Sequence, residues 1–294
     1  MVKIIKSRIV VFAISIALSY LLPVIYQDIL GFILILSIGV IHGANDLLII
    51  KKYTRKNSLK SQISYFFYYL GLVFLGFVFF YLFPSIALLS FVLVSIYHFG
   101  EQHWEVKTSN ADFINVKRIY PIILHGLVFF VIVFMNNIDI VNDVLLSFNT
   151  ISLDYTYLRI LFIVLFLIYM SLLLLSKSIR GYFVDEFIFF ILLFLLTLNS
   201  SLIFGFSIYF IFFHSVLSIK DQVKYIYGDD NSQYIKKYLI SALPYFILAL
   251  LFLIGSYLFI DFESLDILPI MFTFLAAITF PHVIVIEKMY SSMK

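Results

Sequence analysis

Residues 158–175, LRILFIVLFLIYMSLLLL, form an apolar run with a single charged side chain, that of Arg159. A helix that crosses the hydrocarbon core of a bilayer needs about 20 mostly apolar residues, so this run predicts a membrane-spanning helix. Nine similar runs flank it, and the ten predicted spans are 9–26, 30–50, 62–83, 85–101, 118–136, 158–175, 184–198, 201–218, 241–260 and 267–288. Spans seven and eight are separated by so few residues that a re-entrant pair is an alternative there.

The composition agrees with a membrane protein. Of the 294 residues, 63% are hydrophobic and 13% are charged, whereas soluble domains carry about 25% charged residues. We therefore expect an all-α, polytopic bundle of transmembrane helices that forms one domain over residues 1–294. The basic start resembles a signal peptide, but no small-x-small cleavage site follows, which favours an uncleaved first helix.

The residue types exclude cysteine chemistry and argue against nucleic-acid binding. The chain has no cysteine, which excludes disulfides, thiolate nucleophiles, iron–sulfur clusters and zinc–cysteine sites. The net charge of +3 comes from basic residues scattered over short loops, a pattern that does not indicate nucleic-acid binding. Any metal must be held by His, Asp, Glu or other oxygen ligands.

Loop charges predict the orientation of the spans. With ten spans and a cytoplasmic N-terminus, all of the 20 Lys and Arg residues except Arg159 fall on the cytoplasmic side. The opposite loops are acidic and contain Asp28, Asp139, Asp143, Asp154, Asp261, Glu263 and Asp266. Basic residues concentrate in cytoplasmic loops, so both termini are predicted to be cytoplasmic, in a multi-pass protein of the inner (plasma) membrane.

All six histidines lie toward the predicted cytoplasmic ends of the spans. They are His42, His98, His103, His125, His214 and His282. Ionisable residues inside a membrane are costly and mark functional sites. Their shared depth favours a metal site, because neutral imidazole binds iron, copper and zinc well. The alternative is six independent histidines, each satisfied by a carbonyl or hydroxyl group.

The segment IHGANDLL places Asp46 four residues after His42, on the same helix face. Asp46 is a candidate acceptor that fixes the imidazole of a metal ligand; the alternative is that it meets the interfacial loop. In SIYHFGEQHW, His98 and His103 are five residues apart. Both can face one metal only if the helix breaks near Gly100, and Glu101 is a further candidate ligand or hydrogen-bond acceptor.

The later histidines have simpler contexts. Ser218 follows His214 by one helical turn, and Pro281 precedes His282 and is expected to kink the last helix. His125 is interpreted as a structural residue or a support for a ligand. His103 follows Gly100 and is expected to meet water.

The motifs HGAND at His42, SIYHFGEQ at His98, FHS at His214 and PH at His282 resemble those of the Brp/Blh family of membrane β-carotene 15,15′-dioxygenases. The resemblance runs from about residue 40 to 285. It implies non-haem iron, Fe(2+), held by histidines, and cleavage of β-carotene by O₂ to retinal for microbial rhodopsins. The iron ligands it implies are His42, His98 and His214.

This sequence departs from the family pattern at one ligand. The family has a second histidine one turn after the equivalent of His214, and Ser218 stands there. His282 or His103 is then expected to supply the fourth ligand. His282 is preferred because it lies within a predicted helix at about the depth of His42.

Several other functions remain as alternatives. A di-iron desaturase or hydroxylase would need eight or more histidines with HxxxH clusters, which this chain lacks. A metal or haem transporter would have broken helices at mid-membrane. A carotenoid-binding or metal-binding membrane protein, or a metalloenzyme acting on another polyene or lipid, would share the apolar composition.

Reporter fusions test the predicted orientation. Fusions after Lys60 and Lys237 are expected to report the cytoplasm, and fusions near Asp143 and Glu263 the opposite side. The reason is the segregation of Lys and Arg. Opposite locations for the two ends of the chain would contradict the predicted even number of spans.

Overall fold

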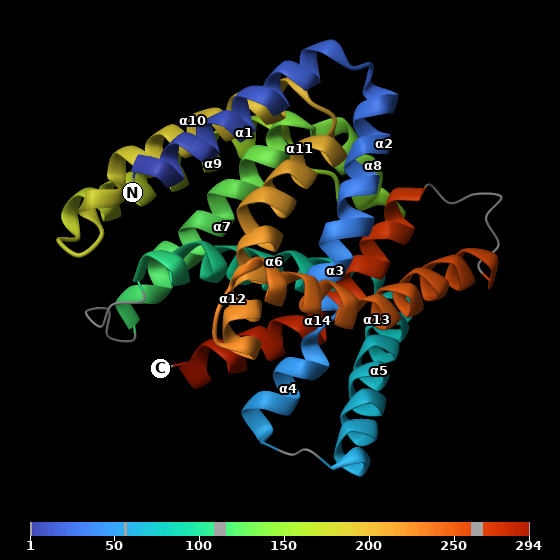
Figure 1. Ribbon diagram of the computed structural model, residues 1–294. Coiled ribbons are helices and arrows are strands. Elements are labelled where there is room, and N and C mark those ends of the chain that lie inside the picture. Colours follow the sequence, from blue (N-terminus) through green and yellow to red (C-terminus); the bar gives the residue numbers. More distant parts are fainter. Residues whose placement is uncertain (1, 56–57, 109–115, 260–266, 294) are drawn as a thin grey trace. The chain divides into compact units, whose positions relative to one another are not determined.

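The computed structural model describes residues 2–55, 58–108, 116–259 and 267–293, and these residues are helical with short connections (Figure 1). Nine helices among them are long and apolar enough to cross a membrane. They cover Val24–Thr54, Leu59–Leu82, Pro84–Glu105, Arg118–Asn136, Tyr155–Leu175, Arg180–Asn199, Leu202–Tyr227, Ser232–Gly255 and Ile267–Met293. The chain is a polytopic α-helical membrane protein, as the sequence predicts.

The first predicted span, 9–26, differs from the structure. Helix α1 (Val2–Leu21) ends before Pro23, and α2 (Val24–Leu34) begins directly after it. Proline disfavours helical backbone at the residue before it, so the predicted span could not run through this position. The apolar part of α1 that can be described, Arg8–Leu21, is shorter than the other nine helices.

The predicted spans 184–198 and 201–218 are separate helices. Helix α10 (Phe183–Asn199) ends at Asn199, and Ser200 is extended. The hydroxyl of Ser201 then accepts a hydrogen bond of 3.2 Å from the amide of Phe204. This N-cap starts α11 (Leu202–Ile208). Each helix is long enough, with its continuation, to cross a membrane alone.

The described residues divide into two compact units. The first unit consists of Met1–Ile35, Ser95–Asp143 and Ile151–His214. In it, α1 packs on α10, α2 on α11, and α7 (Val116–Asn136) on α9 (Tyr155–Leu175). The end of α6 (Pro84–Thr108) also belongs to this unit.

The second unit consists of Leu36–Val94, Val144–Thr150 and Ser215–Lys294. Helix α14 (Ile267–Met293) packs along α5 (Leu59–Leu82) and α4 (Asp46–Thr54). It also contacts the short α3 (Val40–Gly43). Helix α12 (Val216–Tyr227) packs on α13 (Ser232–Phe259). That residues 1–294 form one domain stays a prediction.

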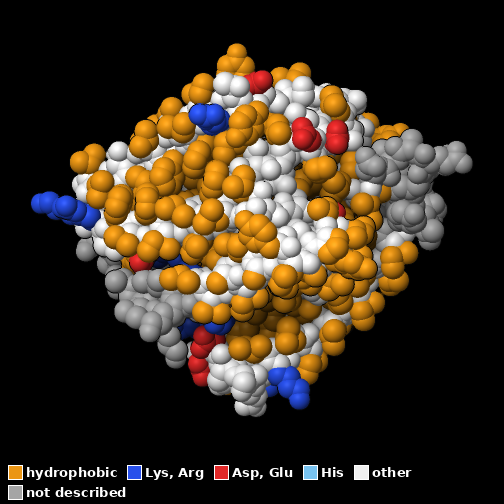
Figure 2. Space-filling model, turned by 90° about the horizontal axis from the view of Figure 1, so that it is seen from above, with side chains coloured by type: hydrophobic (Ala, Val, Ile, Leu, Met, Phe, Trp, Pro, Cys, Tyr) orange, Lys and Arg blue, Asp and Glu red, His pale blue; other side chains and the backbone are white. Residues whose placement is uncertain are grey.

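Hydrophobic side chains cover most of the face in Figure 2, and charged side chains are few there. Large apolar residues such as Leu167, Leu175 and Tyr81 are exposed. Contact of so much apolar surface with water would be unfavourable, whereas contact with lipid tails is favourable. The exposed apolar surface is thus the face that a bilayer covers.

Two glycines allow α6 and α7 to cross in close contact within the first unit. A Cβ atom on Gly100 would overlap the backbone of Ile122, and one on Gly126 would overlap the backbone of Ile96. Small residues at such crossings let helix backbones approach each other in membranes. Gly100 lies between His98 and His103, and Gly126 follows His125, so this crossing sets the separation of the histidine-bearing turns.

Replacing Gly100 or Gly126 by alanine is expected to lower the free energy of unfolding by about 1–3 kcal/mol, because overpacking forces the two helices apart. Gly71→Ala is the control, since nothing lies within 4 Å of the added methyl group. Thermal unfolding of the detergent-solubilised chain measures the difference. Equal midpoints for the three variants would refute the close crossing.

Candidate metal sites

Two of the six histidines lie in or beside π-helical segments. The segment η1 (Ile35–Gly39) precedes His42, and η3 (Tyr209–Ser215) contains His214. A π-turn inserts an extra residue into a helix and so rotates the side chains that follow it; such turns are frequent at functional sites. Neither segment could be predicted from apolar periodicity.

His98 and His214 form a buried pair in the first unit. Each is 1% exposed, their ring centroids are 4.7 Å apart, and the rings meet at 73°. A ring nitrogen of one lies within 4.8 Å of a ring nitrogen of the other. Phe99 and Phe210 pack on His214 at centroid distances of 4.7 and 5.6 Å. Two imidazoles therefore converge in an apolar, water-poor setting.

His42 and His282 form the corresponding pair in the second unit. Their ring centroids are 4.7 Å apart with the rings at 82°. The carboxylate of Asp46 accepts hydrogen bonds from Nδ1 of His282 (2.9 Å) and from the hydroxyl of Tyr69 (2.8 Å). Nδ1 of His42 donates to the carbonyl oxygen of Gly39. With Nδ1 protonated in both rings, the lone pair of each ring lies on Nε2.

The backbone at His42 is held by a second set of hydrogen bonds. The carbonyl oxygen of His42 accepts from Nε2 of Gln222 (2.8 Å) and from the hydroxyl of Tyr238 (3.1 Å). Gln222 also donates to the hydroxyl of Ser218 (3.0 Å), which is fully buried. Ser218 therefore belongs to the network that fixes the turn of His42.

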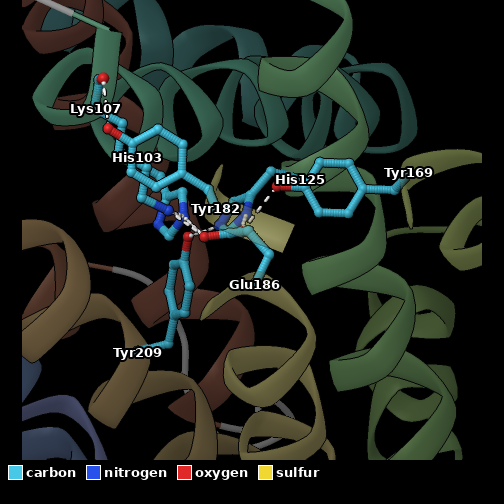
Figure 3. A network of polar contacts seen from close by, with 7 residues as sticks. All are labelled: His103, Lys107, His125, Tyr169, Tyr182, Glu186 and Tyr209. Atoms are coloured by element: carbon cyan, nitrogen blue, oxygen red, sulfur yellow. Dashed lines mark hydrogen bonds and ion pairs between the residues drawn. The ribbon is translucent and has the colours of Figure 1, made fainter. Parts of the chain in front are cut away.

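A third group of polar residues lies entirely within the first unit and is drawn in Figure 3. Glu186, on α10, is fully buried. Its Oε1 lies 2.8 Å from Nε2 of His103, and its Oε2 lies 3.3 Å from Nδ1 of His125. The hydroxyl of Tyr169 donates to Oε2 (2.8 Å). Each of His103, His125 and Glu186 offers a ligand atom within 4.8 Å of the others, so this group has a donor set for a metal ion.

Lys107 supplies positive charge to this group. Its ammonium contacts Oε1 of Glu186 and lies 2.6 Å from Nε2 of His103. Lys107 is located beyond the apolar span Pro84–Glu105, and burial lowers its pKa to about 8, while the attraction of Glu186 raises it. Nε2 of His125 lies 3.0 Å from the hydroxyl of Tyr209, which extends the group to the start of η3.

The structure separates the histidines that the sequence placed near each other. Helix α6 continues without a break through Gly100 to Thr108, so His98 and His103 point into different groups. The expectation that His103 meets water is wrong, because this side chain is 2% exposed. Asp46 is buried and bonded to His282, so it does not meet a loop.

Two other candidates have clear partners. Glu101 accepts a hydrogen bond of 3.0 Å from the hydroxyl of Tyr97. His125 lies stacked on His103, with ring centroids 3.7 Å apart. Sequence reasoning missed Glu186, although an acidic residue inside a predicted span is itself a signal of function.

A polytopic membrane protein with buried groups of histidines is the class that these features define. The family model for β-carotene 15,15′-dioxygenase matches residues 33–290. The chain therefore belongs to the β-carotene 15,15′-dioxygenase family. A comparison with curated proteins found no match, and a comparison with solved structures found none either. All four histidines of the two pairs lie within the matched residues.

Asp46→Ala is expected to destabilise the chain, because the buried Nδ1 of His282 and the partly buried hydroxyl of Tyr69 then lose their shared acceptor. An unsatisfied buried donor costs about 1–3 kcal/mol. Glu287→Ala is the control, since Glu287 is an exposed acidic residue on α14. Thermal unfolding in detergent distinguishes them, and an unchanged midpoint for Asp46→Ala would show that the contact carries no stability.

Proposed function

We propose that this chain is a non-haem iron dioxygenase that cleaves β-carotene at its central double bond with O₂ to give two molecules of retinal. Family membership supports the substrate and the oxidant. The observation that carries the proposal is the burial of two imidazole pairs in helices that bear the family motifs. Such groups are costly inside a membrane unless a partner compensates them.

The proposed iron ligands are His42, His98 and His214, with His282 as the fourth. Imidazole nitrogen is a suitable donor for iron. The hydrogen bonds of His42 to Gly39 and of His282 to Asp46 fix the tautomer that keeps Nε2 available for a metal. This arrangement, a carboxylate or carbonyl behind a metal-binding imidazole, is the usual support for such ligands. The residues therefore fit the metal that the family implies.

The overall reaction balances without any further reductant. The central carbon–carbon double bond breaks, and each of its two carbons gains one oxygen atom of O₂ as an aldehyde oxygen. When bound, iron supplies the O₂ chemistry. The protein supplies the ligands, an apolar setting and the register of the substrate.

The surroundings of His98 and His214 suit an apolar polyene. Phe99 lies against His214 and contacts Phe129, Phe130 and Phe206. These aromatic side chains exclude water from the histidines and offer an apolar surface to a hydrocarbon. β-Carotene partitions into the bilayer, which the exposed apolar helices also contact.

Ser218 has a supporting role in this proposal. Serine is a poor replacement for an imidazole ligand, and its hydroxyl accepts a hydrogen bond from Gln222, which also donates to the backbone of His42. Ser218 thus helps to orient a ligand, and His282 takes the fourth position. Location in the inner (plasma) membrane and transfer of retinal to a microbial rhodopsin stay predictions.

In cells that make β-carotene, the wild-type chain is expected to bleach the orange colour and yield a C20 aldehyde, because central cleavage gives two equal halves. His98→Ala and His214→Ala should abolish bleaching and lower the iron content of the purified chain. Chromatography of the pigments measures the cleavage, and metal analysis of the purified chain measures the iron content.

Ser218→Ala is the matched control and is expected to keep iron, since the hydroxyl is not a ligand here. Asymmetric apocarotenals would contradict central cleavage. Full iron occupancy in both histidine variants would contradict the ligand set, and unchanged pigment with iron bound would point to another polyene or lipid, or to a binding role.

A further inference from the structure

The group around Glu186 lies in the buried interior of the first unit and is not used by the proposed reaction. Five of its members are at most 2% exposed: His103, His125, Tyr169, Glu186 and Tyr209. They come from α6, α7, α9, α10 and the first residue of η3, all within the first unit. Burying the carboxylate of Glu186 costs free energy, so the groups that compensate its charge indicate its role.

The donors and acceptors around His103 indicate a bound cation. Nε2 of His103 lies 2.8 Å from a carboxylate oxygen of Glu186 and 2.6 Å from the ammonium of Lys107. If Nε2 carries a proton, it can donate to Glu186 but faces an N–H of Lys107. If it carries a lone pair, it can accept from Lys107 but faces the lone pairs of Glu186. With Glu186 ionised and Lys107 protonated, no neutral tautomer of His103 makes a hydrogen bond through both contacts.

A metal ion that replaces the ammonium would make Nε2 of His103 and an oxygen of Glu186 neighbouring ligands of one ion, so that their lone pairs no longer oppose each other. His103, His125 and Glu186 each offer one ligand atom, and these atoms lie within 4.8 Å of one another. Tyr169 donates to the same carboxylate, and Tyr209 meets the second nitrogen of His125. Hydrogen bonds of this type orient the ligands of metal sites.

We propose that His103, His125 and Glu186 form a second metal site, for a divalent first-row transition metal, at which Lys107 is the competing cation. Two imidazoles and one carboxylate are a donor set that such ions favour. Lys107 is located beyond the apolar end of α6 and packs over Trp104 and Tyr182. Its long aliphatic stem lets the ammonium extend toward the interface when a metal binds.

The competing explanation is a closed ion pair between Lys107 and Glu186. The two explanations predict opposite results for Lys107→Met. In an ion pair, the substitution leaves Glu186 buried and unpaired, which destabilises the chain. At a metal site, the substitution removes the competitor, and metal binding tightens by roughly tenfold or more because a nearby positive charge is lost.

The test uses the full-length chain in detergent with Co²⁺ as the probe, in a His98→Ala/His214→Ala background that removes two proposed iron ligands. One Co²⁺ per chain, with a visible spectrum of nitrogen and oxygen ligation, is expected in this background. Lys107→Met should bind it more tightly, and Glu186→Gln should lose it. Asp185→Asn is the matched control, because it removes the neighbouring carboxylate on α10 and should keep Co²⁺.

A second measurement tests the proposal if the His98→Ala/His214→Ala variant does not fold. With all histidines intact, Glu186→Gln is expected to lower the metal content from two ions per chain to one, and Zn²⁺ should raise the unfolding midpoint of Lys107→Met above that of the metal-free variant. Absence of Co²⁺ from both the background and its Lys107→Met derivative would overturn the proposal. Equal Co²⁺ binding by Glu186→Gln would also overturn it. If only the proposed iron ligands are wrong, the result differs: the His98→Ala/His214→Ala variant then has the same metal content as the wild-type chain.

Discussion

Lipid offers no hydrogen-bond partners, so buried polar side chains must find their partners within the protein. The rest of this structure depends on that constraint. A membrane-spanning helix can satisfy its own backbone, but imidazole and carboxylate side chains need partners from other helices. In the first unit, Glu186 on α10 is reached by residues of α6, α7 and α9. In the second unit, Asp46 on α4 is reached by α5 and α14. These polar contacts fix which helix faces meet.

Close helix contact and polar pairing support each other. Gly100 and Gly126 let α6 and α7 approach closely, and the flanking His103 and His125 then stack at 3.7 Å. The π-helical segments η1 and η3 reorient the turns at His42 and His214. The sites therefore arise from local departures from regular helix packing that sequence periodicity does not reveal. An apolar bundle with regular packing would have no reason to contain them.

The fold could be predicted from the sequence because each span is a long apolar run, and nine of the ten ranges correspond to helices in the described residues. The first range was too long because Pro23 ends α1. Among site residues, the motifs single out His42, His98, His214 and His282 as candidates, and the structure buries all four. The partner of Asp46 and the role of Glu186 could not be predicted, since both depend on contacts between helices far apart in sequence. Asp261, Glu263 and Asp266, which supported the predicted orientation, lie outside the described residues.

The central claim is that histidines alone hold the catalytic iron, at a place distinct from Glu186. X-ray absorption at the iron edge tests this most directly, on the full chain loaded with one equivalent of Fe²⁺ and on its Glu186→Gln variant. The account predicts a spectrum dominated by imidazole scattering that is the same in both chains and is lost in His98→Ala. A spectrum with carboxylate ligation that disappears in Glu186→Gln would place the iron at His103, His125 and Glu186 and contradict the account.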